Sequence, residues 1–111
     1  MKLITIKQLR KREAEELESS KNGSKFKFIK QKYLILNLYL ERNPSVEYIT
    51  DEISRLKNMI EIYESRFDGW KQLNFKTFGD LTDSQIKSKY NEKFGVSAAK
   101  IQIRNLSELL V

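Results

Sequence analysis

The chain has 111 residues, 40% of them hydrophobic and 32% charged, and it contains no Cys and no His. These absences exclude disulfides, thiolate nucleophiles, zinc sites of the Cys or His type, and His general-base catalysis. No apolar run approaches the roughly 18 residues of a membrane span, and we expect no secretory signal in the first residues. We therefore expect a cytoplasmic, all-α protein that is not an enzyme, with no membrane, metal, cofactor or small-molecule substrate.

The formal net charge of +6 is unevenly distributed along the chain. Residues 1–43 carry eleven basic and five acidic side chains, residues 44–70 carry three and six, and residues 71–111 carry seven and four. Basic surfaces suit nucleic-acid phosphates or an acidic protein partner. In the alternative interpretation, the acidic middle segment simply faces its basic neighbours within the fold.

The first predicted helix starts at Thr5, which forms a capping box with Gln8, and runs to about Ser19. Its basic residues come first and its acidic residues last, an order that opposes the helix dipole. We expect this helix to lean on a partner, although a solvated charged face is the simpler alternative. The candidate contact residues are Arg10, Lys11 and Arg12.

Residues 19–24 have the composition of a turn, and the next helix is predicted over residues 25–42. Apolar residues form one face of this helix and cover most of the rest: Phe26, Ile29, Tyr33, Leu36 and Leu40, then Leu34, Ile35, Leu38 and Tyr39. A helix that is apolar nearly all round is a central one. The alternation of Lys and Phe at its start leaves a strand as the alternative.

The third predicted helix carries an apolar stripe with steps of 3, 4, 3, 4, 3 and 4, namely Val46, Ile49, Ile53, Leu56, Ile60, Tyr63 and Phe67. We expect Asn43 to cap this helix, Pro44 to take its first position, and Gly69 to end it. Such a seam must meet another helix. A coiled coil between chains is possible, but the stripe is wide, so we favour an internal hairpin with the preceding helix.

Residues 70–80 form a predicted connection that is rich in aromatic side chains, Trp70, Phe75 and Phe78. Such residues pack over the edge of a core or reach a partner. Because tryptophan dominates interface hot spots, Trp70 is the best single candidate for an interface anchor.

Two helices are predicted in the last third of the chain. Thr82 and Gln85 form a second capping box, and Ile86, Tyr90 and Phe94 follow at a spacing of four. After Gly95, we expect Ser97 to cap the final helix, whose apolar positions are Ile101, Ile103, Leu106, Leu109 and Leu110.

The stretch from Lys87 to Leu106 resembles a helix-turn-helix. Gly95, Val96 and Ser97 match its left-handed turn residue, the apolar residue after it and the cap of the second helix. The resemblance implies that Ala98, Ala99, Lys100, Gln102 and Arg104 face the major groove. Candidate DNA-contacting residues are Lys87, Lys89, Lys93, Lys100, Gln102 and Arg104, with the lysines on phosphates and the last two on bases.

The resemblance is partial. Asn91 stands where the motif has a small residue, and Arg104 fills a late apolar position. A plain corner between two helices is the alternative interpretation. The carboxylates Asp80 and Asp83 flank a helix start, where the helix dipole alone explains acidic residues.

The sequence thus predicts a helical hairpin or small bundle over residues 1–69, and an aromatic connection with a two-helix corner over residues 70–111, within one compact domain. We expect a small basic binding protein that associates with DNA. The alternatives are an assembly subunit of a larger complex such as a phage virion, or an adaptor or inhibitor that docks on a protein. A protein partner or a homo-oligomer is expected, from a bacterial or phage source. An assembly subunit would reside within the virion.

Overall fold

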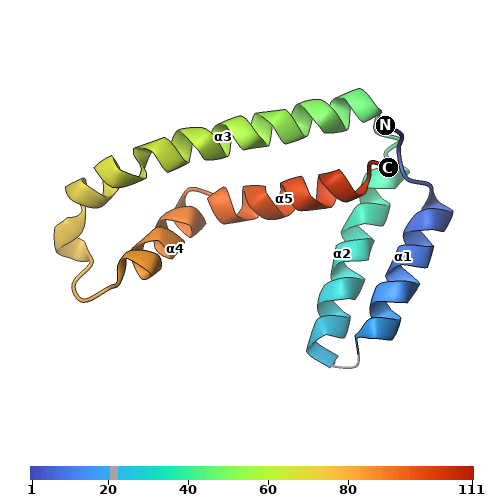
Figure 1. The fold of residues 1–111 in the computed structure, drawn as a ribbon, viewed down its shortest axis with the longest axis horizontal. Coiled ribbons are helices and arrows are strands. Elements are labelled where there is room, and N and C mark those ends of the chain that lie inside the picture. Colours follow the sequence, from blue (N-terminus) through green and yellow to red (C-terminus); the bar gives the residue numbers. More distant parts are fainter. Residues whose placement is uncertain (21–22) are drawn as a thin grey trace. The chain divides into compact units, whose positions relative to one another are not determined.

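Residues 1–20 and 23–111 are described by a computed structural model, drawn as a ribbon in Figure 1. These residues form the helices α1 (Ile6–Ser19), α2 (Gly23–Glu41), α3 (Val46–Leu73), η1 (Phe75–Thr77, a 3-10 helix), α4 (Asp83–Lys93) and α5 (Val96–Glu108). They contain no β-strand, so the all-α prediction is confirmed and the strand alternative for residues 25–40 is wrong. Positions 21 and 22 of the predicted turn lie outside the described residues.

Contacts divide the chain into two units. The terminal unit comprises Met1–Asp51 and Asn105–Val111, and the central unit comprises Glu52–Arg104. Helices α3 and α5 contribute residues to both. The units interleave along the sequence, so they do not correspond to the two segments that we delimited at residue 69.

The two ends of the chain pair with each other in the terminal unit (Figure 1). The Lys2 amide donates to the Val111 carbonyl at 2.8 Å, the Val111 amide donates back at 2.7 Å, and the Ile4 amide donates to the Leu109 carbonyl at 2.7 Å. Ile4 and Leu109 are also buried. Backbone pairing and apolar burial therefore hold both ends together.

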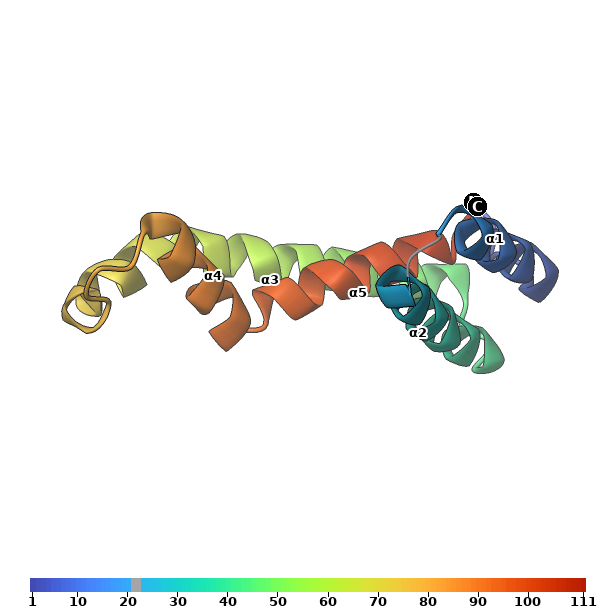
Figure 2. The same cartoon turned by 90° about the horizontal axis from the view of Figure 1, so that it is seen from below.

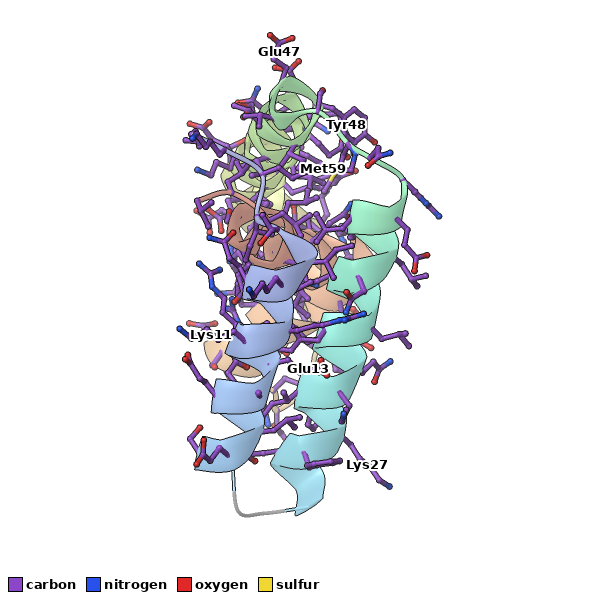
Figure 3. All side chains as sticks on the ribbon, turned by 90° about the vertical axis from the view of Figure 1, so that its right-hand side faces the viewer. Lys11, Glu13, Lys27, Glu47, Tyr48 and Met59 are labelled. Atoms are coloured by element: carbon purple, nitrogen blue, oxygen red, sulfur yellow. The ribbon has the colours of Figure 1, made fainter. Side chains whose placement is uncertain are left out.

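Helices α1 and α2 form an antiparallel pair in the same unit (Figures 1 and 3). The predicted capping box of α1 is confirmed: the Thr5 amide donates to Gln8 Oε1 at 2.9 Å, and the Gln8 amide donates to Thr5 Oγ1 at 3.1 Å. The helix has no acidic residue in its first turn and no basic residue in its last. The buried side chains of the unit are Ile4, Leu9, Tyr33, Leu36, Leu40, Ile49, Leu106 and Leu109.

The junction between α2 and α3 differs from the prediction. Asn43 adopts a left-handed conformation with φ 49°, and its amide donates to the Leu40 carbonyl at 3.0 Å. Asparagine tolerates this conformation, so Asn43 closes α2 instead of opening α3. The cap of α3 is Ser45, whose Oγ accepts from the Tyr48 amide at 3.0 Å, and Pro44 precedes the helix.

The apolar stripe of α3 packs as predicted, since each of its seven side chains is buried or half-buried. The predicted end of the helix at Gly69 is wrong. Gly69 is helical, and α3 continues to Leu73, where Asn74 Nδ2 donates to the Trp70 carbonyl at 2.8 Å. The extra turn places Trp70 among aromatic rings, and this packing outweighs the low helix propensity of one glycine.

The core of the central unit is a cluster of aromatic rings between the second half of α3 and α4. The Tyr63 and Phe94 ring centroids are 5.4 Å apart, and those of Phe67 and Tyr90 are 5.1 Å apart. The Tyr90 hydroxyl donates to the Tyr63 carbonyl. We predicted α2 as the partner of the seam, but α1 is the helix that pairs with α2, and these seam residues contact α4.

Helices α3 and α5 also lie side by side within the central unit (Figures 1 and 2). Lys100 Nζ on α5 is 3.3 Å from Glu64 Oε1 on α3. One acidic residue of α3 therefore pairs with a basic residue of α5, whereas at the other end of α3 Lys71 pairs with Asp83 of α4.

Candidate interaction surfaces

A polar network holds the inward side of α2. Lys32 Nζ lies 3.3 Å from Glu16 Oε1 and 2.8 Å from Glu108 Oε1. Burial lowers the pKa of Lys32, but hydrogen bonds and charge attraction from Glu108 and Glu16 outweigh it, so the pKa is raised. The Tyr33 hydroxyl donates to Glu16 Oε1 at 2.7 Å, and burial followed by this bond raises the pKa of Tyr33. These contacts fix which side of α2 faces its own unit.

The opposite side of α2 carries a second apolar row that is open to solvent. We call it the outward stripe, and its residues follow at steps of 3, 4, 3 and 4: Phe28, Gln31, Ile35, Leu38 and Arg42. The last of them, Arg42, lies one residue past the end of α2. Phe28 is 75% exposed and Leu38 is 49% exposed, and neighbouring Leu34 is 60% exposed. The prediction that α2 is a central helix, covered all round, is therefore wrong.

Two hollows lie at the C-terminal end of the outward stripe. One, of about 260 Å³, is lined by Tyr39, Arg42, Pro44 and Tyr48. The other, of about 180 Å³, is lined by Ile35, Leu38, Tyr39 and Arg42. Because Tyr39 and Arg42 line both, the hollows are neighbours, and each combines apolar walls with one guanidinium group.

Exposed cations lie near both ends of the outward stripe. From residue 23 to residue 42 the sequence has five basic side chains and one acidic side chain, Glu41, but Lys32 belongs to the inward network. Lys30 lies 3.6 Å from Glu13, which points between α1 and α2, whereas Lys27 is exposed at the other end of α2 from Arg42 (Figure 3). Arg42 is exposed and makes no ion pair with any described residue.

The sequence contained a signal for this surface. The steps of 3 and 4 from Phe28 to Arg42 form a seam of their own, and the polar Gln31 and Arg42 within it are unsuited to a core. Apolar residues on every side concealed the seam, because composition alone does not show which sides the chain covers.

The predicted corner between α4 and α5 is present. The capping box of α4 is confirmed by bonds of 2.9 Å and 3.2 Å between Thr82 and Gln85. Gly95 has φ 72°, and Val96 is fully buried. However, α5 begins at Val96, and the Gly95 carbonyl accepts from the Ala99 amide at 3.0 Å, so Ser97 lies inside the first turn and is not the cap.

The residues predicted to contact DNA differ in exposure and in their contacts. Lys89, Lys93 and Arg104 are exposed. Lys100 is exposed as well but pairs with Glu64, and two of the lysines lie over rings: Lys87 Nζ is 4.3 Å from the Phe67 centroid and Lys93 Nζ is 5.7 Å from that of Phe94. Gln102 is half-buried, and its side chain or backbone already interacts within the fold.

Two further positions of the helix-turn-helix resemblance are occupied differently from the motif. Ala99, which we expected to face the groove, is only 3% exposed and belongs to the core. Asn91, at the position of the small residue, has a buried Oδ1 without a hydrogen-bond partner among the described residues. Both findings weaken the resemblance.

The basic block of α1 is open to solvent. Arg10, Lys11 and Arg12 are all exposed. Arg12 Nη1 also donates to the Glu108 carbonyl at 3.2 Å, so this side chain helps to hold the end of α5 within the terminal unit. Lys11 lies on the side of α1 away from α2 (Figure 3).

The aromatic residues of the predicted connection have different positions. Trp70 lies in α3, with its ring centroid 5.0 Å from that of Tyr90 and 5.2 Å from that of Phe78. Both are therefore part of the core of the central unit. Phe75 is 65% exposed and lines a hollow with Asp68, Lys71 and Gln72. Of the three, Phe75 is the one that presents most of its surface to solvent.

The carboxylate of Asp83, at the start of α4, is paired with a lysine. Asp83 Oδ1 lies 2.6 Å from Lys71 Nζ. Within residues 1–20 and 23–111, no three acidic side chains come together as a metal site would require. None of the helices in these ranges combines the length and apolar character that crossing a bilayer demands.

The chain matches no protein-family model, no curated protein sequence and no solved structure.

Proposed function

We propose that this chain is a non-catalytic binding protein that docks another protein on the outward stripe of α2. The observation that carries the proposal is the exposure of the stripe residues Phe28, Leu38 and Ile35, which are 75%, 49% and 37% exposed. Large apolar side chains exposed along one face of a helix are typical of an interaction site. An adaptor, an inhibitor and an assembly subunit all use such a surface.

The residue content supports binding over catalysis. Without His or Cys, proton transfer and nucleophilic attack would depend on carboxylates, hydroxyls and amines. Two of the carboxylates, Glu16 and Glu108, are both paired with Lys32 and serve the packing of α2.

Affinity purification from cells of the source organism tests the proposal with three forms of the chain. The wild type and the control Ser84→Glu, an exposed position on α4, should retain the same stoichiometric partner. Leu38→Glu should lose it, because a buried carboxylate without a partner opposes docking. A partner that all three forms retain equally would contradict the proposed surface.

DNA binding is the second candidate function. It is favoured by the exposure of Lys89, Lys93 and Arg104 around a corner whose turn residue, Gly95, is left-handed. These side chains suit phosphate contacts, which depend on salt and carry no sequence information.

A further inference from the structure

We propose that the outward stripe of α2 and its two hollows bind an acidic amphipathic helix of a partner protein. This inference rests on the proposed function, because it names the chemical class of the protein that docks there. It is carried by three features of the terminal unit, namely the spacing of the stripe, the hollows at its end, and the charges around it.

The spacing indicates that the occupant is helical. Steps of 3 and 4 residues present a straight row of side chains into which the side chains of a second helix can insert. From Phe28 to the end of α2 at Glu41 the helix rises over 13 residues, which is about 20 Å at 1.5 Å per residue, and Arg42 follows directly. A partner helix of four turns matches this length.

The hollows indicate where the partner's apolar side chains insert. Ile35 and Leu38 wall one hollow, and Pro44 and Tyr48 wall the other. Interface energy concentrates where large side chains fill such hollows. Two apolar side chains one helical turn apart on the partner would occupy the pair.

The charges indicate that the partner is acidic. Arg42 lines both hollows and has no ion pair among the described residues. A guanidinium group binds a carboxylate through two parallel hydrogen bonds, and this geometry gives specificity as well as attraction. Lys27 supplies a second exposed cation near the other end of the stripe, and Glu41 is the one carboxylate of α2.

The same charges disfavour a second copy of this chain as the occupant. An antiparallel pairing of two outward stripes brings Lys27 close to Arg42 of the other copy, and a parallel pairing brings like residues together. Like charges across an interface suppress pairing. The net charge of +6 adds to this repulsion.

Selection from a displayed library tests the proposal with the full chain as bait. The library consists of helical peptides of 18 residues with randomised surface positions. We expect the selected peptides to combine Asp or Glu with apolar residues at steps of 3 and 4. Leu38→Glu should abolish their binding, Arg42→Glu should weaken it at least about tenfold, and Ser84→Glu should leave it unchanged. Both altered stripe residues are exposed, and circular dichroism with a melting curve verifies that each variant is folded.

The outcomes separate the inference from the proposed function. Binding that is lost in Leu38→Glu but shows neither acidic enrichment nor sensitivity to Arg42→Glu overturns the acidic partner and leaves docking intact. The proposal of an acidic helix is also overturned if the selected peptides bind the Leu38→Glu variant as tightly as the wild type. A selection that yields no helical binder overturns it as well. If the chain forms a dimer that Leu38→Glu dissociates, the stripe binds a second copy. If the chain adsorbs to phosphatidylserine vesicles and Leu38→Glu abolishes this adsorption, the stripe binds a membrane. Either result overturns the proposal of an acidic helix.

Discussion

The hydroxyl of Tyr33 donates a 2.7 Å hydrogen bond to the carboxylate of Glu16, which joins α2 to α1 on the side of α2 opposite the outward stripe. The contact is reinforced by Lys32, which lies within 3.3 Å of the same carboxylate. Hydrogen bonds to a charged acceptor are stronger than those between neutral groups. Together with the burial of Leu36 and Leu40, this contact keeps the inward side of α2 against its own unit and leaves the outward stripe exposed.

Replacing Tyr33 with Phe should lower the free energy of unfolding by about 1–2 kcal/mol at pH 7, because a hydrogen bond to a charged group is lost. Urea denaturation followed by circular dichroism measures the change. A matched substitution, Tyr48→Phe, alters a phenol that is 59% exposed and should change stability little. Equal effects of the two substitutions would contradict the account.

Stability should fall at alkaline pH. The folded state raises the pKa of Tyr33 above the ordinary value of 10.0 and that of Lys32 above 10.5, and burial raises that of Tyr90. Groups with a raised pKa contribute stability that is complete below the unfolded pKa and is lost as pH rises through the folded value. The free energy of unfolding should therefore decline above about pH 10. The decline should be shallower in Tyr33→Phe, and an identical slope would refute the assignment.

Two glycines should respond in opposite directions to replacement by Ala. Gly69 is helical, so Gly69→Ala should stabilise the chain by about 0.5–1 kcal/mol. Gly95 has φ 72°, so Gly95→Ala should destabilise it by about 1–2 kcal/mol. A Cβ at either position meets no atom within 4 Å, so the difference reports backbone conformation alone. Thermal denaturation of both variants decides, and destabilisation by Gly69→Ala would show that α3 ends earlier.

The pairing of the chain ends should be important for stability. Leu109 is fully buried beside the Ile4–Leu109 backbone bond, so Leu109→Ala should cost about 2–5 kcal/mol. Val111→Ala is the control, because this side chain is 46% exposed and its backbone bonds to Lys2 are retained. Chemical denaturation of the two variants gives the comparison. Similar losses in both would argue against an apolar anchor at Leu109.

Binding to duplex DNA over a salt series tests the second candidate function. Each phosphate contact should contribute about −0.9 to the slope of log affinity against log salt concentration. Substituting the exposed Lys89, Lys93 and Arg104 by Ala should flatten this slope. Substituting the engaged Lys87 and Lys100 should alter it less. If the chain does not bind duplex DNA at low salt, DNA binding is not its function.

The sequence correctly predicted the helix starts at which a capping box forms. Thr5 and Thr82 cap as predicted because each capping box is complete within four residues. Asn43 and Gly69 did not behave as predicted. Asn43 has a left-handed alternative that closes the preceding helix, and Gly69 is carried through α3 by the tertiary packing of Trp70.

The candidate site was less predictable than the fold. The stripe of α3 was predicted to pack, and it does, but its partner residues Tyr90 and Phe94 are distant in sequence. The apolar residues of the outward stripe of α2 predict a buried face, which is wrong, because periodicity identifies a seam and does not identify what covers it. Only the position of α1 shows that one side of α2 is packed and the other is open.

Site-specific photo-crosslinking tests the central claim most directly. A photoreactive phenylalanine analogue replaces Leu38 on the outward stripe, or Ser84 on α4 as the control, in cells of the source organism. The account predicts one defined protein adduct from position 38 that is absent from position 84 and disappears when Ile35 is also changed to Glu. Equal adducts from both positions, or none that depends on position 38, would contradict the claim that this chain works by docking a protein on α2.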